Sequence, residues 1–220
     1  MKKIVSIIIT NFNRCKFLDR AIRSCFDQSI SREIETEVIV VDDGSTDDSV
    51  KMLTRFKDGI KVINHKKNLG VAAASNTGVN SCKGDFILRL DSDDFLSKYC
   101  IQTLSQILIE NEEYGFAYSD HYRVDEKGFK EHKKKLASNE DLFEHGAGVL
   151  FRKKVFEDVG LYNESLKNCE DFDFLVRVIS KFKGFYIPIP LYRYYIHGDN
   201  ISLSKNRKKF KQVVKKIHEL

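Results

Sequence analysis

Residues 4–14 read Ile-Val-Ser-Ile-Ile-Ile-Thr-Asn-Phe-Asn-Arg, a short apolar run that gives way to polar residues after Thr10. β-Branched residues dominate the run, which is typical of a strand buried on both faces, and the polar residues predict a loop directly after it. In residues 17–26 the apolar side chains then recur with the spacing of an amphipathic helix. The chain is therefore expected to begin with a buried strand followed by a helix.

The same alternation continues to about residue 95. Strands are expected over 37–41, 60–63 and 85–90, with one helix that starts near Ser45 and Asp48 and another over 71–81. Strand and helix in strict alternation predict a parallel sheet covered by helices.

The second half is less regular. Helices are expected over 98–109, 153–159 and 170–180, strands over 115–119 and 148–151, and an exposed hairpin or mobile loop over 124–136. Residues 186–194 contain both prolines of the chain, which favours an edge or terminal strand.

Composition limits the possible classes of protein. The 220 residues are 42% hydrophobic and 31% charged, which suits a globular domain. Residues 205–220 hold seven basic residues and one acidic residue, so 1–204 carry 30 basic and 31 acidic residues, and a nucleic-acid partner is not expected. The longest apolar stretches are too short to span a bilayer, and five cysteines without a C-x-x-C pair suit a reducing compartment. We expect a cytoplasmic protein.

Acidic clusters follow two of the expected strands. The Asp42-Asp43 pair and the Asp91-Ser92-Asp93-Asp94 cluster each come directly after an apolar run, as Thr10 does. Ligands of open α/β sheets bind at the carboxyl ends of the strands, so these side chains are expected at one edge. Each cluster alone could be a helix cap or a turn. Together, five carboxylates would repel one another unless a divalent cation offset them, and an Asp-x-Asp pair suits Mg²⁺ or Mn²⁺.

A series of short motifs, including those described above, indicates the family of the chain. They are Ser6 to Arg14, Val40 to Asp47, Asn68-Leu69-Gly70, Asn76-Thr77-Gly78, Leu90 to Asp94, Gly148 to Arg152, Gly160-Leu161-Tyr162, Glu170 to Phe174, and Tyr194 to Ser202. In this order the chain resembles the inverting family 2 glycosyltransferases of bacterial-type glycan biosynthesis. The resemblance implies one α/β domain of GT-A fold over 1–203, a mixed sheet flanked by helices. Its nucleotide-sugar half would span 1–95 and its acceptor half 96–203.

The resemblance also implies roles for individual residues. Asp171 matches the general base, which takes a proton from the acceptor hydroxyl. Asp93 and His197 match metal-binding positions for Mn²⁺ or Mg²⁺. The positions that match the nucleotide-sugar site are Thr10, Phe12, Asp42, Asp43, Asn76 and Asp91. A carboxylate can accept a hydrogen bond from N3–H of uracil, which favours a UDP-linked donor. The acceptor would be a hydroxyl of a glycan or a lipid-linked glycan, shaped in part by the region near His145.

Two positions depart from the family pattern. Ser75 stands where relatives often have an arginine before the asparagine, so Lys66 or Lys67 is expected to supply the missing cation. Asn11 stands in place of a small residue after the first strand.

Other functions remain open on the residues alone. One is a domain that binds a nucleotide sugar or a glycan without turnover. Another is a haloacid dehalogenase-type phosphatase. That motif normally has Thr or Val at the position of Phe95 and lies on the first strand, whereas here it follows the fourth expected strand. A nucleotidyltransferase would usually carry a Gly-rich loop after the first strand, and residues 10–14 hold no glycine.

The basic tail, 204–220, has the pattern of an amphipathic helix. Phe210, Val213, Val214 and Ile217 share one face, and lysines occupy the remaining positions. Such a helix can lie on an anionic membrane, so we expect peripheral contact with the inner face of the cell membrane. The alternative is that its apolar face packs on the domain.

Overall fold

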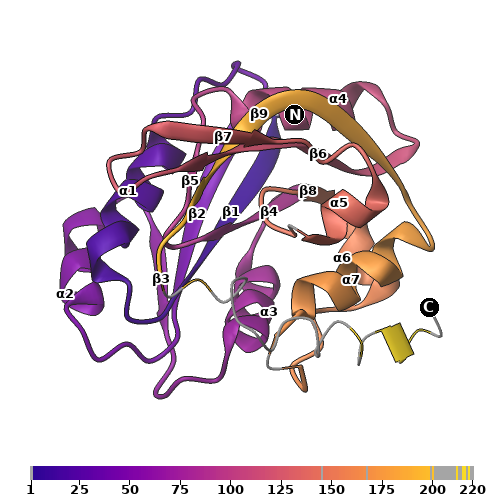
Figure 1. Cartoon of the computed structure of the whole chain (residues 1–220). Helices are drawn as coiled ribbons and strands as arrows, with labels where there is room; N and C mark the ends of the chain where they lie inside the picture. The colour runs from indigo at the N-terminus through magenta and orange to yellow at the C-terminus, as the bar shows by residue number, and fades with distance from the viewer. Residues whose placement is uncertain are drawn as a thin grey trace.

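The computed structural model describes residues 2–144, 146–166, 168–198 and 200, together with the single positions 212, 215, 216 and 218. Helices surround a twisted central sheet (Figure 1). Within the described residues this sheet has nine strands, eight of them in the order β3-β2-β1-β4-β8-β6-β9-β5, and β7 pairs with β6 outside this path. A mixed α/β sheet flanked by helices is confirmed.

The first half forms the parallel part of the sheet. Its strands are β1 (Lys3–Asn11), β2 (Ile34–Asp42), β3 (Lys61–Asn64) and β4 (Phe86–Asp91). Its helices are α1 (Cys15–Phe26), α2 (Ser49–Leu53) and α3 (Val71–Ser81), with a 3₁₀ turn over Thr54–Phe56. The start of α2 differs from the expectation. Ser45 lies outside the helix, and its hydroxyl accepts hydrogen bonds from the Asn13 N–H and the Asn11 amide.

The second half extends the sheet with antiparallel pairs and one parallel pair, β6 with β9. Its strands are β5 (Phe95–Leu96), β6 (Tyr114–Val124), β7 (Lys130–Lys134), β8 (Leu150–Arg152) and β9 (Lys183–Tyr195). Its helices are α4 (Cys100–Glu110), α5 (Asn139–Glu144), α6 (Lys153–Val159) and α7 (Glu170–Ile179). The expected hairpin over 124–136 is present, because β7 returns antiparallel along β6.

The expectation of an edge or terminal strand over 186–194 holds only for the first part of this stretch. β9 pairs in parallel with β6 on one side and with the short β5 on the other. Its register with β6 breaks between Ile187 and Tyr192, and Pro188 and Pro190 fall inside that break. Proline cannot donate to a ladder, and both prolines lie outside the stretch of β9 that has a strand on each side, because β5 pairs only with Tyr192 and Arg193.

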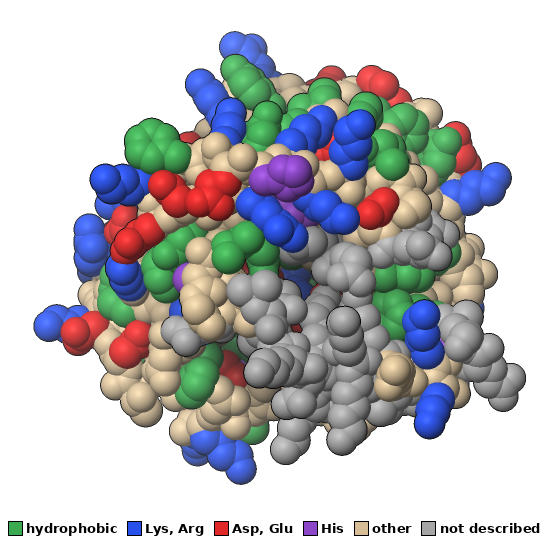
Figure 2. Space-filling model, viewed as in Figure 1, with side chains coloured by type: hydrophobic (Ala, Val, Ile, Leu, Met, Phe, Trp, Pro, Cys, Tyr) green, Lys and Arg blue, Asp and Glu red, His purple; other side chains and the backbone are tan. Residues whose placement is uncertain are grey.

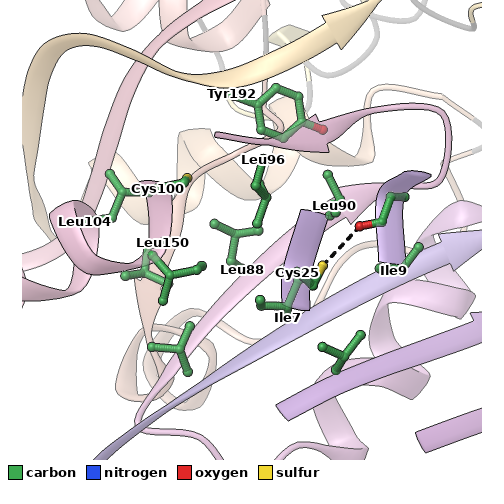
Figure 3. Close-up of a cluster of buried hydrophobic side chains, with 14 of the residues drawn as sticks. Ile7, Ile9, Cys25, Leu88, Leu90, Leu96, Cys100, Leu104, Leu150 and Tyr192 are labelled. Atoms are coloured by element: carbon green, nitrogen blue, oxygen red, sulfur yellow. Dashed lines mark hydrogen bonds between the residues drawn. The ribbon is translucent and has the colours of Figure 1, made fainter. Parts of the chain in front are cut away.

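Two hydrophobic cores cover the two faces of the sheet. Successive side chains of a strand point to opposite faces, so Ile7 and Ile9 join one core while Ile8 joins the other. The first core packs the sheet against α1 and α4 (Figure 3). The second packs it against α3, α6 and α7. Both cores hold the carboxyl ends of β1, β2 and β4 in fixed register.

Most of the tail expected to form an amphipathic helix lies outside the described residues. Of its described positions, His218 contacts the domain, with Nε2 at 2.9 Å from Oδ1 of Asp173 on α7. None of the helices among the described residues combines the length and the apolar character needed to span a bilayer.

Candidate functional site

The polar ends of three parallel strands lie side by side. In the register of the sheet Thr10 aligns with Asp91, and Asn11 aligns with Asp42. Thr10 is mostly buried, whereas Phe12 just beyond it is 41% exposed. The prediction that these polar groups meet at one edge of the sheet is confirmed.

Asp42 and Asp43 are buried, and both accept hydrogen bonds from the surrounding loops. The Asp42 carboxylate accepts from the Asn11 amide at 2.8 Å and from the Ser45 N–H at 2.9 Å. The amide of Asn11 therefore joins the ends of β1 and β2, which explains why an asparagine rather than a small residue stands there.

Asp43 organises the loop that leads into α3. Its carboxylate accepts from His65 Nδ1 at 2.7 Å and from the N–H groups of Leu69 and Gly70 at 2.9 and 2.8 Å. Gly44 allows this approach, because it has a φ of +75° and a Cβ there would lie 2.5 Å from the backbone of Lys67. His65 was not predicted from the sequence, although its place directly after β3, at the same sheet edge, was a usable signal.

The Asp91–Asp94 turn is fixed by the end of β9. Asp94 is buried and accepts hydrogen bonds from the Tyr192 hydroxyl and the Tyr195 N–H, both at 2.8 Å. Burial, followed by the charges of Asp93 and Asp91, raises the pKa of Asp94 well above its ordinary value. Asp94 therefore serves as an internal anchor for the turn, while the Asp91 side chain is one-third exposed.

Asp93 and His197 meet across this edge. His197 Nε2 lies 2.8 Å from Oδ2 of Asp93, and both side chains are largely buried. The imidazole packs against two aromatic rings that also contact each other, with its centroid 5.4 Å from that of Phe17 and 5.1 Å from that of Tyr195. The structure thus brings together the two residues that the sequence analysis paired as metal ligands.

Asp93 and His197 suit a divalent cation whose other ligands are oxygens of a bound diphosphate. Asp93 offers a carboxylate oxygen and His197 an imidazole nitrogen, and Mn²⁺ accepts both. Mg²⁺ and Mn²⁺ are commonly held by one or two protein groups together with phosphate oxygens and water. Within the described residues, no three His, Cys, Asp or Glu side chains gather as a metal centre. The pair therefore suits a shared site better than an all-protein site.

Asp171 lies in the first turn of α7, beside a buried ion pair. Glu170 Oε1 accepts from Arg89 Nη1 at 2.8 Å, and Arg89 Nε lies 3.6 Å from Oδ1 of Asp91. Gly146 packs so closely on Asp171 that a Cβ there would lie 2.6 Å from the Asp171 Cβ. Arg89 was not predicted from the sequence, although a single charged residue inside the apolar run of β4 was the signal for it.

Asn76 and Ser75 face the interior of the protein. The Asn76 amide donates to the Tyr162 carbonyl and to Glu164, and accepts from the Tyr162 N–H, at 2.8 to 2.9 Å. Ser75 is buried and donates to the Val71 carbonyl within its own helix. Lys66 and Lys67 are exposed on the loop before α3. The expected roles of Asn76 and of the two lysines toward a donor stay predictions.

Similar folds occur in solved structures. S. aureus TarS 1-349 in complex with UDP-GlcNAc superposes with a TM-score of 0.79 at 19% identity, over 97% of this chain and 65% of that one. The mannosyltransferase PcManGT from Pyrobaculum calidifontis, in complex with GDP-Man and Mn²⁺, gives a TM-score of 0.70 at 13% identity, over 91% and 59% of the two chains.

Similar sequences include two bacterial synthases. The chain is 27% identical to chondroitin synthase of Escherichia coli and 26% identical to hyaluronan synthase of Pasteurella multocida, in each case over 92% of its length. It spans only 30% and 21% of those two proteins. The model of the family "Glycosyl transferase family 2" matches residues 6–160, which is most of the chain. The chain therefore belongs to glycosyl transferase family 2.

Proposed function

We propose that the chain transfers a sugar from a nucleotide-sugar donor to a hydroxyl group of a glycan or a lipid-linked glycan, with inversion at the anomeric carbon. The contact between Asp93 and His197, at the sheet edge that carries Asp42, Asp43 and Asp91, is the observation that carries the proposal. Family membership supports it, as do the donors bound by the neighbours TarS and PcManGT. A UDP-linked sugar is the proposed donor, and polysaccharide synthesis the proposed setting.

The donor side of the site consists of this sheet edge. Thr10, Phe12, Asp42 and Asp43 would face the base and ribose, and Asp91 the ribose. Asp93 and His197 would hold Mn²⁺ or Mg²⁺ against the diphosphate. When bound, the cation offsets the negative charge that develops on the leaving diphosphate.

Asp171 supplies the base on the acceptor side. Its carboxylate would take the proton of the acceptor hydroxyl as the oxygen attacks the anomeric carbon from the side opposite the diphosphate. The new carbon–oxygen bond forms while the bond to the diphosphate oxygen breaks, so one displacement inverts the anomeric configuration. The first turn of a helix favours an ionised carboxylate, which is the form a base requires.

A screen of nucleotide sugars tests the proposal. A donor that binds the native state raises the unfolding temperature, so a UDP-sugar should do so with Mn²⁺ and much less with chelator. The stabilising donor is then incubated with glycan acceptors, and the anomeric configuration of the product is read by NMR. Stabilisation without transfer or donor hydrolysis would favour a non-catalytic binding domain. Stabilisation by none of the nucleotide sugars would contradict the proposal.

A further inference from the structure

A buried arginine connects the two sides of the candidate site. Arg89 lies on β4 two residues before Asp91, so both side chains share one face of the strand. It is only 7% exposed, and its guanidinium donates to Glu170, the residue next to Asp171. A single side chain thus spans from the strand that carries Asp91 to the helix that carries Asp171.

The neighbourhood of Arg89 restricts its movement. The guanidinium carbon lies 5.4 Å from the ring centroid of Tyr162, whose backbone is held in turn by Asn76. Glu170 is 5% exposed, so its carboxylate depends on the arginine for compensation of its charge. Breaking a buried pair from one side leaves an uncompensated charge, which makes this contact costly to rearrange.

The charges around Asp171 are of both signs. Arg89 approaches from β4, the neutral phenol of Tyr162 from the segment before α7, and Glu170 from its own helix, while Asp91 faces Arg89. Burial and the charge of Asp171 raise the pKa of Glu170, and Arg89 opposes that rise. Although burial alone would lower it, the charges of Asp91 and Glu170 raise the pKa of Arg89, so the cation is permanent.

We propose that Arg89 is a positioning residue, which fixes Glu170 and thereby the first turn of α7 to β4, so that Asp171 is held at a set place relative to Asp91. This inference rests on the proposed function for the role of Asp171 as a base. Arg89 itself touches neither the acceptor nor the reacting atoms. It acts through the backbone of α7 and through its charge.

Opposite changes of charge give the sharpest test. Arg89→Met removes the cation and leaves Glu170 beside Asp171, so the acid limb of the kcat/KM pH profile should move upward by about one pH unit. Glu170→Gln removes the anion and should move the same limb downward. In the double variant the acid limb should lie between those of the two single variants. In Arg89→Lys the limb should stay near that of the wild type, while kcat falls about tenfold, because a flexible ammonium replaces the planar guanidinium that donates to Glu170 and lies over the Tyr162 ring.

Arg152→Met serves as the matched control. Arg152 also joins separate elements, donating to the carbonyls of Tyr114 and Asn111, but it contacts none of the charges around Asp171 in the described structure. This variant should lose stability without moving the acid limb. If the role of Arg89 were purely structural, Arg89→Met and Glu170→Gln would also leave the acid limb where it is in the wild type.

A second readout needs no activity. With ¹³C-labelled aspartate, the Asp171 carboxyl resonance is the one that Asp171→Asn removes, and its titration midpoint can be followed without substrate. The midpoint should move upward in Arg89→Met and downward in Glu170→Gln. Midpoints that stay in place, or move in the same direction, would overturn the inference. Absence of transfer by the wild-type chain would count against the proposed function alone, because the titration would still test Arg89.

Discussion

His197 Nε2 lies 2.8 Å from Oδ2 of Asp93, although the two residues are 104 positions apart in the sequence. The contact joins the turn after β4 to the segment after β9, and the aromatic rings of Phe17 and Tyr195 fix the imidazole. The two atoms are candidate ligands for one cation.

Removal of either partner should weaken metal-dependent donor binding. Asp93→Ala is expected to abolish Mn²⁺-dependent binding of UDP, and His197→Ala to weaken it at least about tenfold, because each supplies one donor to a shared site. Titration calorimetry with UDP, with and without Mn²⁺, measures the difference. His132→Ala, on the exposed strand β7, is the control and should bind as the wild type does. Unchanged binding by Asp93→Ala would exclude it as a ligand.

Gly146→Ala should impair transfer more than it impairs folding. Its Cβ would lie 2.6 Å from the Cβ and 3.0 Å from Oδ2 of Asp171, so the carboxylate must move. A displacement of about 1 Å can cost roughly 100-fold in rate, whereas local overpacking costs about 1–3 kcal/mol of stability. Rates and urea unfolding are compared with Gly59→Ala, where the nearest atom is the end of the exposed Phe26 ring. Equal rates in the two variants would contradict the close packing of residue 146 on Asp171.

The carboxylate of Asp120 should make the free energy of unfolding decrease as the pH falls into the acidic range. Although burial alone would raise it, hydrogen bonds from Tyr186, Lys133 and the Leu136 N–H lower the pKa of Asp120. A carboxylate with a lowered pKa stabilises the fold above its unfolded pKa of about 3.9, and that contribution is lost as pH falls through the folded pKa.

Asp120→Asn is accordingly expected to lower the free energy of unfolding at pH 7 by about 1–3 kcal/mol. The difference in free energy of unfolding between the variant and the wild type should become smaller below about pH 4, because the wild-type carboxylate is then protonated and no longer stabilises the fold. Urea unfolding at pH 7, 5 and 3 measures it. A difference that is constant with pH would show that the charge of Asp120 contributes nothing.

The basic tail should bind anionic membranes. Each lysine near an anionic surface contributes about 1 kcal/mol, and the attraction weakens with salt. The full chain is expected to sediment with anionic vesicles at low salt, and a chain that ends at Ser204 is not. Zwitterionic vesicles and high salt are the controls. The contact of His218 with Asp173 supports the alternative that the tail packs on the domain, and equal partitioning of the two chains would establish that alternative.

On the face shown in Figure 2, acidic and basic side chains stand side by side around the rim. Mixed charge of this kind gives little attraction to an anionic lipid or to a nucleic acid.

Local patterns were sufficient to predict the parallel half of the sheet. The buried runs of β1, β2 and β4 and the helix spacing of α1 are signals within a few residues, and parallel pairing then brings Thr10, Asp42 and Asp91 together. The second half depends on long-range pairing. β9 has a strand on each side only at Tyr192 and Arg193, and its register with β6 breaks where the two prolines lie. Nothing in residues 186–194 alone indicates that break or the pairing with β5.

The candidate site was predictable only in part, for a related reason. Acidic residues at strand ends are visible in the sequence, but the distant residues that form hydrogen bonds and ion pairs with them are not. Asp94 became an internal anchor because Tyr192 and Tyr195 come from a distant strand. Arg89 and Glu170 are 81 residues apart, and only the packing of α7 on β4 brings them into contact.

Asp171→Asn tests the central claim most directly, because it changes one oxygen to nitrogen and removes the proposed base. With the donor found in the thermal screen, calorimetry should give a donor affinity within about threefold of the wild type, and the unfolding temperature should be similar. The transfer rate should fall by about 10² to 10⁴-fold, because the amide cannot take the proton of the acceptor hydroxyl. Transfer at a rate close to that of the wild type, with the donor bound equally well, would contradict the account and remove Asp171 from the mechanism.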